Sequence, residues 1–322
     1  MQRFILGIDV GGTSIKIGCL DLNLKLIGKT SEPNSGDIEP QQMVENIFSV
    51  SSRLLRQCKI SLEQVKSVGV GAPGPLDPKT GIIQSAPNLK TFRNTPFRDM
   101  ISARFGRPVF LENDANAACW GERVAGAGSG INDMVFLTLG TGVGGGIVTN
   151  GQIVHGTSGE AAELGHIIIY PDGRLCGCGQ KGCVEAYASA SATAARAAEA
   201  LQQGTKSSLK KVLEKNGKVT CKNVFEHAEK GDELAKQIVE QTAEALGLVC
   251  VSLLHITQPQ KIIFGGGMIA AGQVLLDRIR YYFKQHIWTI KPEDNVEICF
   301  ATLGEDAGII GTAALAREIQ NK

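Results

Sequence analysis

The sequence predicts an α/β protein built from two related lobes with a cleft between them. Its 322 residues correspond to about two domains of roughly 150 residues each. Two segments, 4–32 and 133–156, repeat one pattern in which apolar runs flank a glycine-rich turn, and strands and helices follow each of them. Because ligands of α/β proteins usually bind at strand ends and domain interfaces, we expect the functional site in the cleft.

The first half begins with strand, turn, strand, turn and strand over residues 4–32, with the second turn at Asp21–Asn23. Alternating apolar runs bounded by Gly, Asn and Asp are typical of such hairpins. A polar helical stretch follows over 40–59, and apolar strands follow over 65–74 and 108–114.

The second half repeats this order. A strand enters a glycine-rich turn at 140–146, and the pair Asn150-Gly151 indicates a further hairpin. Ala-rich helices are expected at 186–203 and 224–255, a strand and helix from 261, and a last strand at 295–304 before a final helix. We place the first lobe at 1–115 and the second at 116–305, with the helix over about 306–322 returning to the first.

Composition excludes several classes of protein. Lys and Arg number 33 against 32 Asp and Glu, whereas nucleic-acid-binding domains usually show a basic excess. No apolar run approaches the roughly 20 residues of a membrane helix, and residues 1–12 lack the features of a cleavable signal. We therefore expect a cytoplasmic protein that binds neither nucleic acid nor membrane, with its six scattered cysteines reduced.

The first glycine-rich turn has the composition of a phosphate site. Gly11 and Gly12 permit close backbone approach, and free N–H groups there can cradle phosphate. Thr13 adds a hydroxyl and Lys16 a positive charge, while Asp9 offers oxygen atoms suited to Mg²⁺ held through water. The alternative is a plain tight turn.

The later glycine clusters suggest two more nucleotide contacts. Gly140, Gly142 and Gly145 match the dinucleotide fingerprint, but that motif requires a following helix and a strand follows here. A second phosphate-facing hairpin fits better. Gly265–Gly267 lie between a strand and a helix, where backbone can lie against an adenosine, although helix packing also uses glycine at such places.

A cysteine cluster indicates a metal site. His166 precedes Cys176, Cys178 and Cys183, which lie within a turn-rich loop. Three thiolates and one imidazole form a closed tetrahedral ligand set suited to structural Zn²⁺. The alternative is a group of loose thiols near a turn.

Polar residues at the end of the 108–114 strand suggest acid–base chemistry. Asp114 can accept a proton from a hydroxyl nucleophile and Asn113 can bind a hydroxyl. The alternative role for Asp114 is a helix N-cap, because ANAACWGE follows. We expect Glu112 to face solvent or the opposite side of its strand.

Glu163 and His166 lie three residues apart before an apolar run expected to be a strand, and Glu185 follows Cys183 by two. A zinc ion held by His166 and Cys183 would draw these carboxylates together as partners for sugar hydroxyls. Glu160 competes with Glu163 for this role.

At this point the chain resembles the ROK family of sugar kinases, within the actin and hexokinase-like (ribonuclease H-like) superfamily, over nearly its whole length. The matching stretches, in order, are GIDVGGTSIK, GVGAPGPLD, ENDANAA, LGTGVGGGIV, AAELGH, CGCGQKGCVEAYAS and IIFGGGM. The resemblance implies a two-lobed fold and an ATP-dependent phosphotransferase.

The resemblance also implies a role for each candidate residue. Asp114 would be the general base that takes the proton of a sugar hydroxyl as it attacks the γ-phosphate of ATP. His166 would bind zinc through one ring nitrogen and the sugar through the other. The implied sugar ligands are Asn113, Glu163, His166 and Glu185. The implied ATP-binding residues are Asp9, Gly11, Gly12, Thr13, Lys16, Gly140, Thr141, Gly142, Gly265 and Gly266. Ala162 departs from the family pattern, since many members have Gly there, and its methyl group would trim the sugar pocket.

The expected activity is that of a glucokinase with ATP, Mg²⁺ and structural Zn²⁺. The alternatives are kinases of N-acetylmannosamine or N-acetylglucosamine, other hexoses, and a polyphosphate donor in place of ATP. A sugar-sensing regulator is a distant alternative, because regulators of this family carry a helix-turn-helix domain and here the first hairpin begins within ten residues of Met1. By resemblance we expect a homo-oligomer, either a dimer or a tetramer.

Overall fold

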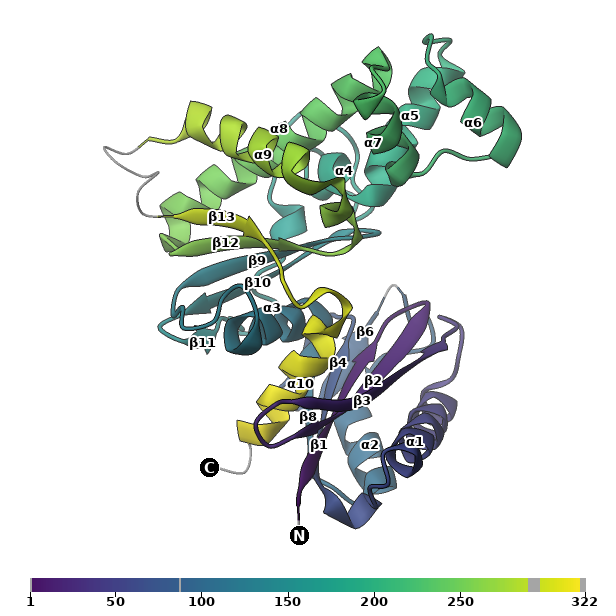
Figure 1. Cartoon of the computed structure of the whole chain (residues 1–322), viewed down its shortest axis with the longest axis vertical. Coiled ribbons are helices and arrows are strands. Elements are labelled where there is room, and N and C mark those ends of the chain that lie inside the picture. Colours follow the sequence, from purple (N-terminus) through teal and green to yellow (C-terminus); the bar gives the residue numbers. More distant parts are fainter. Residues whose placement is uncertain (1, 87, 289–295, 319–322) are drawn as a thin grey trace. The chain divides into compact units, whose positions relative to one another are not determined.

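A computed structural model describes residues 2–86, 88–288 and 296–318, and the chain divides into two compact units (Figure 1). Unit 1 comprises Met1–Gly130, Gly146–Ala162 and Thr302–Lys322, and unit 2 comprises Ile131–Gly145 and Glu163–Ala301. The expected boundary at residue 116 falls inside helix α3 (Asp114–Ala125). Helix α3 belongs wholly to unit 1 because it packs against α10 (Ala307–Glu318).

Two five-stranded sheets share one strand order, and this confirms the repeat expected from the sequence. The orders are β3-β2-β1-β4-β8 and β11-β10-β9-β12-β13. In the first sheet β4 and β8 continue in parallel from β1, and in the second β13 and β9 lie parallel to β12. Their strands are β1 Phe4–Val10, β2 Ser14–Asp21, β3 Leu26–Pro33, β4 Val65–Ala72, β8 Val109–Asn113, β9 Met134–Leu139, β10 Val143–Thr149, β11 Gln152–Ile153, β12 Lys261–Gly265 and β13 Glu297–Phe300.

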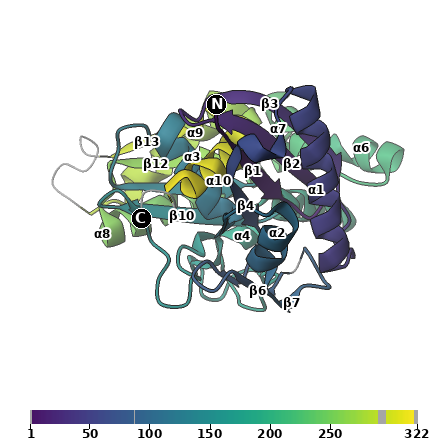
Figure 2. The same cartoon turned by 90° about the horizontal axis from the view of Figure 1, so that it is seen from below.

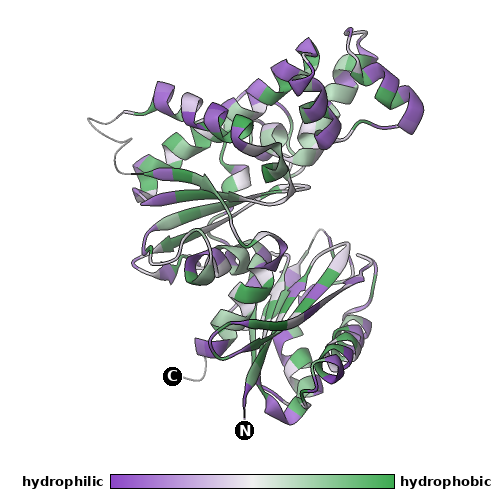
Figure 3. Cartoon of the chain, in the orientation of Figure 1, coloured by the Kyte–Doolittle hydropathy of each residue, from purple (hydrophilic) through white to green (hydrophobic). Residues whose placement is uncertain are grey.

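Helices cover both faces of the unit 1 sheet. Helices α1 (Pro40–Gln57) and α2 (Phe97–Phe105) lie on one side, and α10 with α3 lies on the other (Figures 1 and 2). Between the sheet and the layer of α1 and α2 lies a large apolar core that includes Ile8, Ile17 and Met43. Figure 3 shows apolar residues concentrated along the strands of both sheets.

Helix α10 approaches the sheet to backbone contact. A Cβ atom at Gly69 would lie 1.9 Å from the carbonyl oxygen of Thr312, and one at Gly7 would lie 2.1 Å from that of Ile309. On the other side of α10, a Cβ atom at Gly311 would lie 1.7 Å from the carbonyl oxygen of Ala117 in α3. Glycine is required at these places because any side chain would separate the layers.

Unit 1 also contains elements that the sequence analysis did not predict. These are helix α2 and a small sheet of β5 (Leu76–Asp77), β6 (Ile82–Ser85) and β7 (Arg93–Thr95). The strands of this sheet are two to four residues long, so they carry too few residues to show an alternating pattern.

Unit 2 is rich in helices. Its helices are α4 Glu185–Ala188, α5 Ala190–Gln202, α6 Leu209–Asn216, α7 Cys221–Glu229, α8 Glu233–Thr257 and α9 Gly272–His286. The 3₁₀ helices of the chain are η1 Leu62–Gln64, η2 Leu164–His166, η3 Gly267–Ala271 and η4 Gly304–Asp306. Helix α8 packs against α4, α5, α7 and α9, so it forms the centre of this helical layer.

Three expectations about unit 2 were wrong. The helix expected over 224–255 is two helices, because Gly231 has φ 92° and Asp232 caps α8 through the backbone N–H of Ala235. The helix expected over 186–203 is interrupted at Ser189, which caps α5. The strand expected after His166 is reduced to an isolated bridge between Ile168 and Cys183.

Helix α8 is also long and apolar enough to cross a membrane by length and composition alone, contrary to the expectation of no such run. However, 61% of its most apolar stretch is buried inside the structure. This pattern is typical of a core helix, whose apolar side chains are covered by neighbouring elements.

Two turns show where positive φ values matter. Asn150 and Gly151 have φ of 49° and 73°, which confirms the predicted two-residue hairpin. Ala162, which has φ 67°, adopts the left-handed conformation that favours glycine. The residue that departs from the family pattern is therefore also a strained one.

Replacing Ala162 by Gly should remove this strain. We expect the free energy of unfolding to rise by about 0.5–1 kcal/mol, because relief of the roughly 1–2 kcal/mol left-handed penalty exceeds the roughly 0.5–1 kcal/mol entropic cost of glycine. Thermal or urea unfolding measures the change. Ala161→Gly is the matched control, because Ala161 is not among the residues with positive φ, and it should lower stability through backbone entropy. A loss of stability in Ala162→Gly would contradict the assignment.

Candidate active site

The first glycine-rich hairpin joins β1 to β2 in unit 1. Asp9 pairs with Lys16 across the two strands, and the turn is closed by a bond from the Gly11 amide to the carbonyl oxygen of Ser14, 2.9 Å long. Asn34 Nδ2 donates to the carbonyl oxygen of Gly11 at 2.7 Å. The turn that contains Gly12 and Thr13 is therefore held from a neighbouring strand.

Asp9 is half-buried at this hairpin. Burial and then the charge of Asp114 raise the pKa of its carboxyl to about 6, although Lys16 opposes the shift. The two carboxyl groups are therefore close enough within unit 1 for the charge of Asp114 to disfavour ionisation of Asp9. A divalent cation would relieve their repulsion, so this pair fits the expected magnesium.

Asn113 and Asp114 lie where β8 ends and α3 begins. Asn113 is the N-cap: its Oδ1 accepts from the backbone N–H groups of Ala115 at 2.9 Å and Asn116 at 3.2 Å. Asp114 is the first helical residue, and its Oδ1 accepts from the Ala115 N–H at 2.8 Å. The capping role considered for Asp114 therefore belongs to Asn113.

Burial raises the pKa of the Asp114 carboxyl above its ordinary value, while backbone N–H donors oppose the shift. A carboxylate whose pKa is raised is a better proton acceptor than an ordinary aspartate. The position after a parallel strand and at a helix N-terminus holds this group rigidly.

The second glycine-rich hairpin lies in unit 2 and holds Glu185. The backbone N–H of Val143 donates to Glu185 Oε2 at 2.9 Å, and a Cβ atom at Gly142 would lie 2.3 Å from the same oxygen. The carbonyl oxygen of Gly140 accepts from the Ala190 N–H at 2.8 Å. The hairpin and the start of the α4–α5 region thus form one rigid group.

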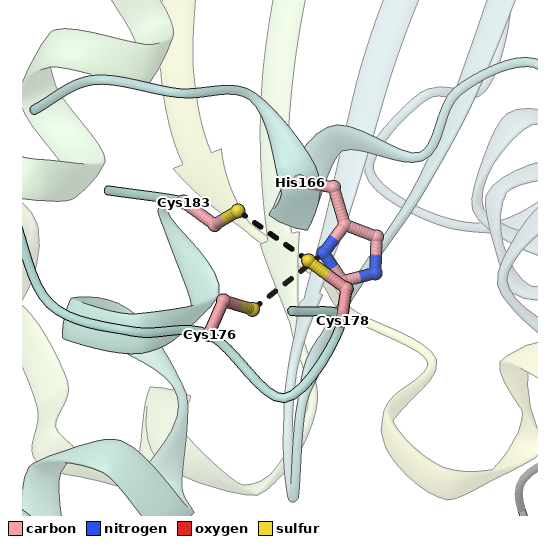
Figure 4. Close-up of side chains that lie close together, drawn as sticks. All are labelled: His166, Cys176, Cys178 and Cys183. Atoms are coloured by element: carbon pink, nitrogen blue, oxygen red, sulfur yellow. Dashed lines mark hydrogen bonds between the residues drawn. The ribbon is translucent and has the colours of Figure 1, made fainter. Parts of the chain in front are cut away.

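The cysteine cluster converges as its spacing predicts (Figure 4). The ligand atoms of His166, Cys176, Cys178 and Cys183 all lie within 4.8 Å of one another. Cys178 Sγ is 3.7 Å from Cys183 Sγ, and Cys176 Sγ is 3.8 Å from His166 Nδ1. Tetrahedral bonds of about 2.3 Å place sulfurs about 3.8 Å apart, so the set fits Zn²⁺.

The other groups near this cluster lie on the same unit. Cys176 Sγ is 3.6 Å from Glu185 Oε1, so Glu185 connects the cysteine loop to the second hairpin. Glu163 directly precedes η2, which carries His166, and both side chains are exposed. Glu160, the competitor of Glu163, is exposed and belongs to unit 1.

A cavity of about 740 Å³ opens beside the second hairpin in unit 2. Gly140 and Thr141 line one side, Phe225 of α7 lines another, and the lining after β12 begins at Gly267. Gly265 and Gly266, expected here, are not part of the lining. Gly265 instead packs against Phe136, and Gly266 against the backbone of β9. The mixed apolar and backbone lining suits a nucleoside.

The sequence analysis missed one buried group. The prediction that Glu112 faces solvent was wrong, because its side chain is 0% exposed. Its Oε2 lies 2.7 Å from Nε2 of His155, a residue not singled out at all. The available signal was the position of Glu112 in a parallel strand, since such strands are covered on both faces.

Comparisons with known proteins agree with these features. The ROK family model matches residues 5–319. A glucokinase from Halalkalibacterium halodurans is 38% identical over 99% of this chain and 97% of its own length, and one from Thermotoga maritima is 35% identical over 98% and 97%. An N-acetylmannosamine kinase from Citrobacter koseri is 30% identical over 97% of this chain and 98% of its own length.

A solved structure shares the fold. The ROK family glucokinase from Streptomyces griseus, in complex with glucose and AMPPNP, superposes with a TM-score of 0.82 at 34% identity, covering 98% of this chain and 99% of that one. This likeness confirms the expected hexokinase-like α/β class. With the family model matching almost end to end, the chain belongs to the ROK family of proteins.

Proposed function

We propose that this chain is an ATP-dependent glucokinase that converts D-glucose and ATP to glucose 6-phosphate and ADP. The observation that carries the proposal is Asp114, a half-buried carboxyl at the end of β8 whose pKa is raised and whose charge acts on Asp9 of the glycine-rich hairpin. The glucokinases among its relatives, at 35–38% identity over nearly the whole chain, support glucose as the sugar.

In this mechanism Asp114 accepts the proton of the sugar 6-hydroxyl as that oxygen attacks the γ-phosphate of ATP. Asn113, Glu163, Glu185 and His166 bind the other hydroxyls. Backbone N–H groups of both hairpins, with Thr13, Lys16 and Thr141, hold the phosphates, and the 740 Å³ cavity takes the adenosine. Mg²⁺ neutralises phosphate oxygens, and Asp9 would hold it through water.

Zinc is the proposed structural cofactor. Burial raises the pKa of Cys183 to about 12 and raises that of Cys176, and a bound cation would hold these sulfurs as thiolates. His166 Nδ1 faces the sulfurs, which leaves Nε2 for the sugar. The ion would order the loop that precedes Glu185.

The sugar is tested with an ADP-release assay on glucose, mannose, fructose, N-acetylglucosamine and N-acetylmannosamine. We expect glucose to give the highest kcat/KM by about tenfold or more, which equals roughly 1.4 kcal/mol of transition-state binding. The N-acetylmannosamine kinase relative makes N-acetylated sugars the second candidate. A preference for one of them would overturn glucose specificity but retain the kinase mechanism, and polyphosphate in place of ATP tests the donor.

Asp114→Asn should lower kcat by about 10²–10⁴-fold, the usual contribution of a general base, while glucose binding persists. In the wild type, kcat/KM should fall as the pH drops through the raised pKa of Asp114, above the ordinary aspartate range near 4. Calorimetry measures glucose binding. Asp99→Asn, at an exposed ion pair with Arg98, is the control. Near-normal turnover by Asp114→Asn would exclude it as the base.

Cys178→Ser tests the metal site, because Cys178 is exposed and its replacement leaves the buried sulfurs in place. We expect loss of about one zinc per chain by elemental analysis, a lower melting temperature and a higher glucose KM. Cys58→Ser, in unit 1, should keep the metal. Unchanged zinc content in Cys178→Ser would refute the Cys₃His site.

The homo-oligomer also remains a proposal, and light scattering on the purified protein decides between monomer, dimer and tetramer.

A further inference from the structure

Glu112 is a fully buried carboxylate directly before the proposed sugar ligand and base. Its Oε1 accepts from the backbone N–H of Asn113 at 2.9 Å and from Asn116 Nδ2 at 3.1 Å. Asn116 makes this bond although its own buried Oδ1 has no hydrogen-bond partner. Three donors, with His155, thus converge on one acceptor group, which is the environment of an ionised carboxylate.

His155 provides the third donor, and among these three donors it is the one that can carry a charge. Its Nε2 lies 2.7 Å from Glu112 Oε2, and its side chain is 31% exposed. The two residues are 43 apart in the chain, but both belong to unit 1. The pair therefore joins the β8–α3 junction to the segment 154–162 that follows β11.

Backbone hydrogen bonds also hold the 154–162 segment. The Val154 N–H donates to the carbonyl oxygen of Ile147, and the Ala161 N–H donates to that of His155. Near its end the backbone runs close to β5, where a Cβ atom at Gly159 would lie 2.9 Å from the carbonyl oxygen of Leu76. The segment then passes through Ala162 into Glu163.

We propose that His155 is a positioning residue: as an imidazolium bound to Glu112, it holds the 154–162 segment against the junction that carries Asn113 and Asp114, and so sets the affinity for the sugar. This inference rests on the proposed kinase function. His155 is not among the proposed substrate ligands, and we infer that it acts through its contact with Glu112. The charge of His155 neutralises the buried carboxylate of Glu112, two residues before the proposed base Asp114, and so lowers the free-energy cost of burying that carboxylate.

The charge state of His155 follows from its surroundings. The hydrogen bond to Glu112 raises the pKa of His155 above its ordinary value of 6.5, burial opposes this, and the charge of Lys79 also lowers it. The Cys119 thiol also faces Glu112, but burial and Glu112 hold its pKa far above neutrality. The ion pair is therefore present below the pKa of folded His155 and is lost as the pH rises through it.

The test compares His155→Ala and His155→Gln with the wild type and with His255→Gln, which alters an exposed histidine of unit 2. We expect His155→Ala to raise the glucose KM by roughly tenfold to a hundredfold, as small misplacements of a positioning segment do. The effect on kcat should be smaller. His155→Gln keeps a donor but no charge, and its KM should lack the rise that we expect in the wild type as the pH passes through the raised pKa of His155.

A double-mutant cycle identifies the partner. If His155 acts through Glu112, the loss in kcat/KM for His155→Ala combined with Glu112→Gln should be much smaller than the product of the single losses. Circular dichroism checks that each variant is folded. Should His155→Ala fail to fold, the milder His155→Gln and its pH profile decide.

Two results separate the possible failures. If wild-type protein turns over no sugar, the proposed function fails and this inference fails with it. If the wild type is active but the His155 variants retain its KM and pH profile, or lose only melting temperature, the pair is purely structural and the positioning role is wrong.

Discussion

The close packing of α10 is the constraint on which the rest of unit 1 depends. Glycines at positions 7 and 69 let the helix backbone rest on the sheet, and Gly311 lets α3 rest on the helix. Because backbone meets backbone at these contacts, with no side chain between the layers, the packing of α10 sets where α3 lies in this unit. The N-terminus of α3 carries Asn113 and Asp114, so the geometry of the proposed sugar and base positions follows from a helix almost two hundred residues later in the chain.

Carboxylates shielded from solvent are the second theme of this unit, and each has a different set of partners. Asp9 and Asp114 are half-buried and the charge of Asp114 disfavours ionisation of Asp9, whereas the fully buried Glu112 has three donors. Glu122 of α3 accepts from the backbone N–H groups of Ala127 at 2.7 Å and Leu303 at 2.8 Å, which anchors the segment leading into α10. Burying a charge is costly unless it is paired or hydrogen-bonded. Glu112 and Glu122 meet that condition through their donors. In the proposed site, Asp9 and Asp114 keep carboxylate oxygens available for ligands.

In unit 2 one carboxylate links the proposed zinc loop to the proposed phosphate hairpin. Glu185 accepts from the Val143 N–H through one oxygen and lies beside Cys176 through the other. A Cβ atom at Gly142 would lie 2.3 Å from that carboxylate, so a larger residue there would displace Glu185. The proposed metal, sugar and phosphate ligands of this unit are thus connected through Glu185, and a bound zinc ion would act on the chemistry through the placement of that residue.

The sequence by itself determined whatever depends on local composition and spacing. The hairpins, their Asn150-Gly151 turn and the converging Cys₃His set all follow from residues close together in the chain. Tertiary structure decided what depends on distant partners. The burial of Glu112, its pairing with His155 and the membership of α3 in unit 1 are set by segments tens to hundreds of residues away. Hydrophobic periodicity carries no information on such contacts, because a buried charge is stabilised by the particular donors that the completed fold brings to it.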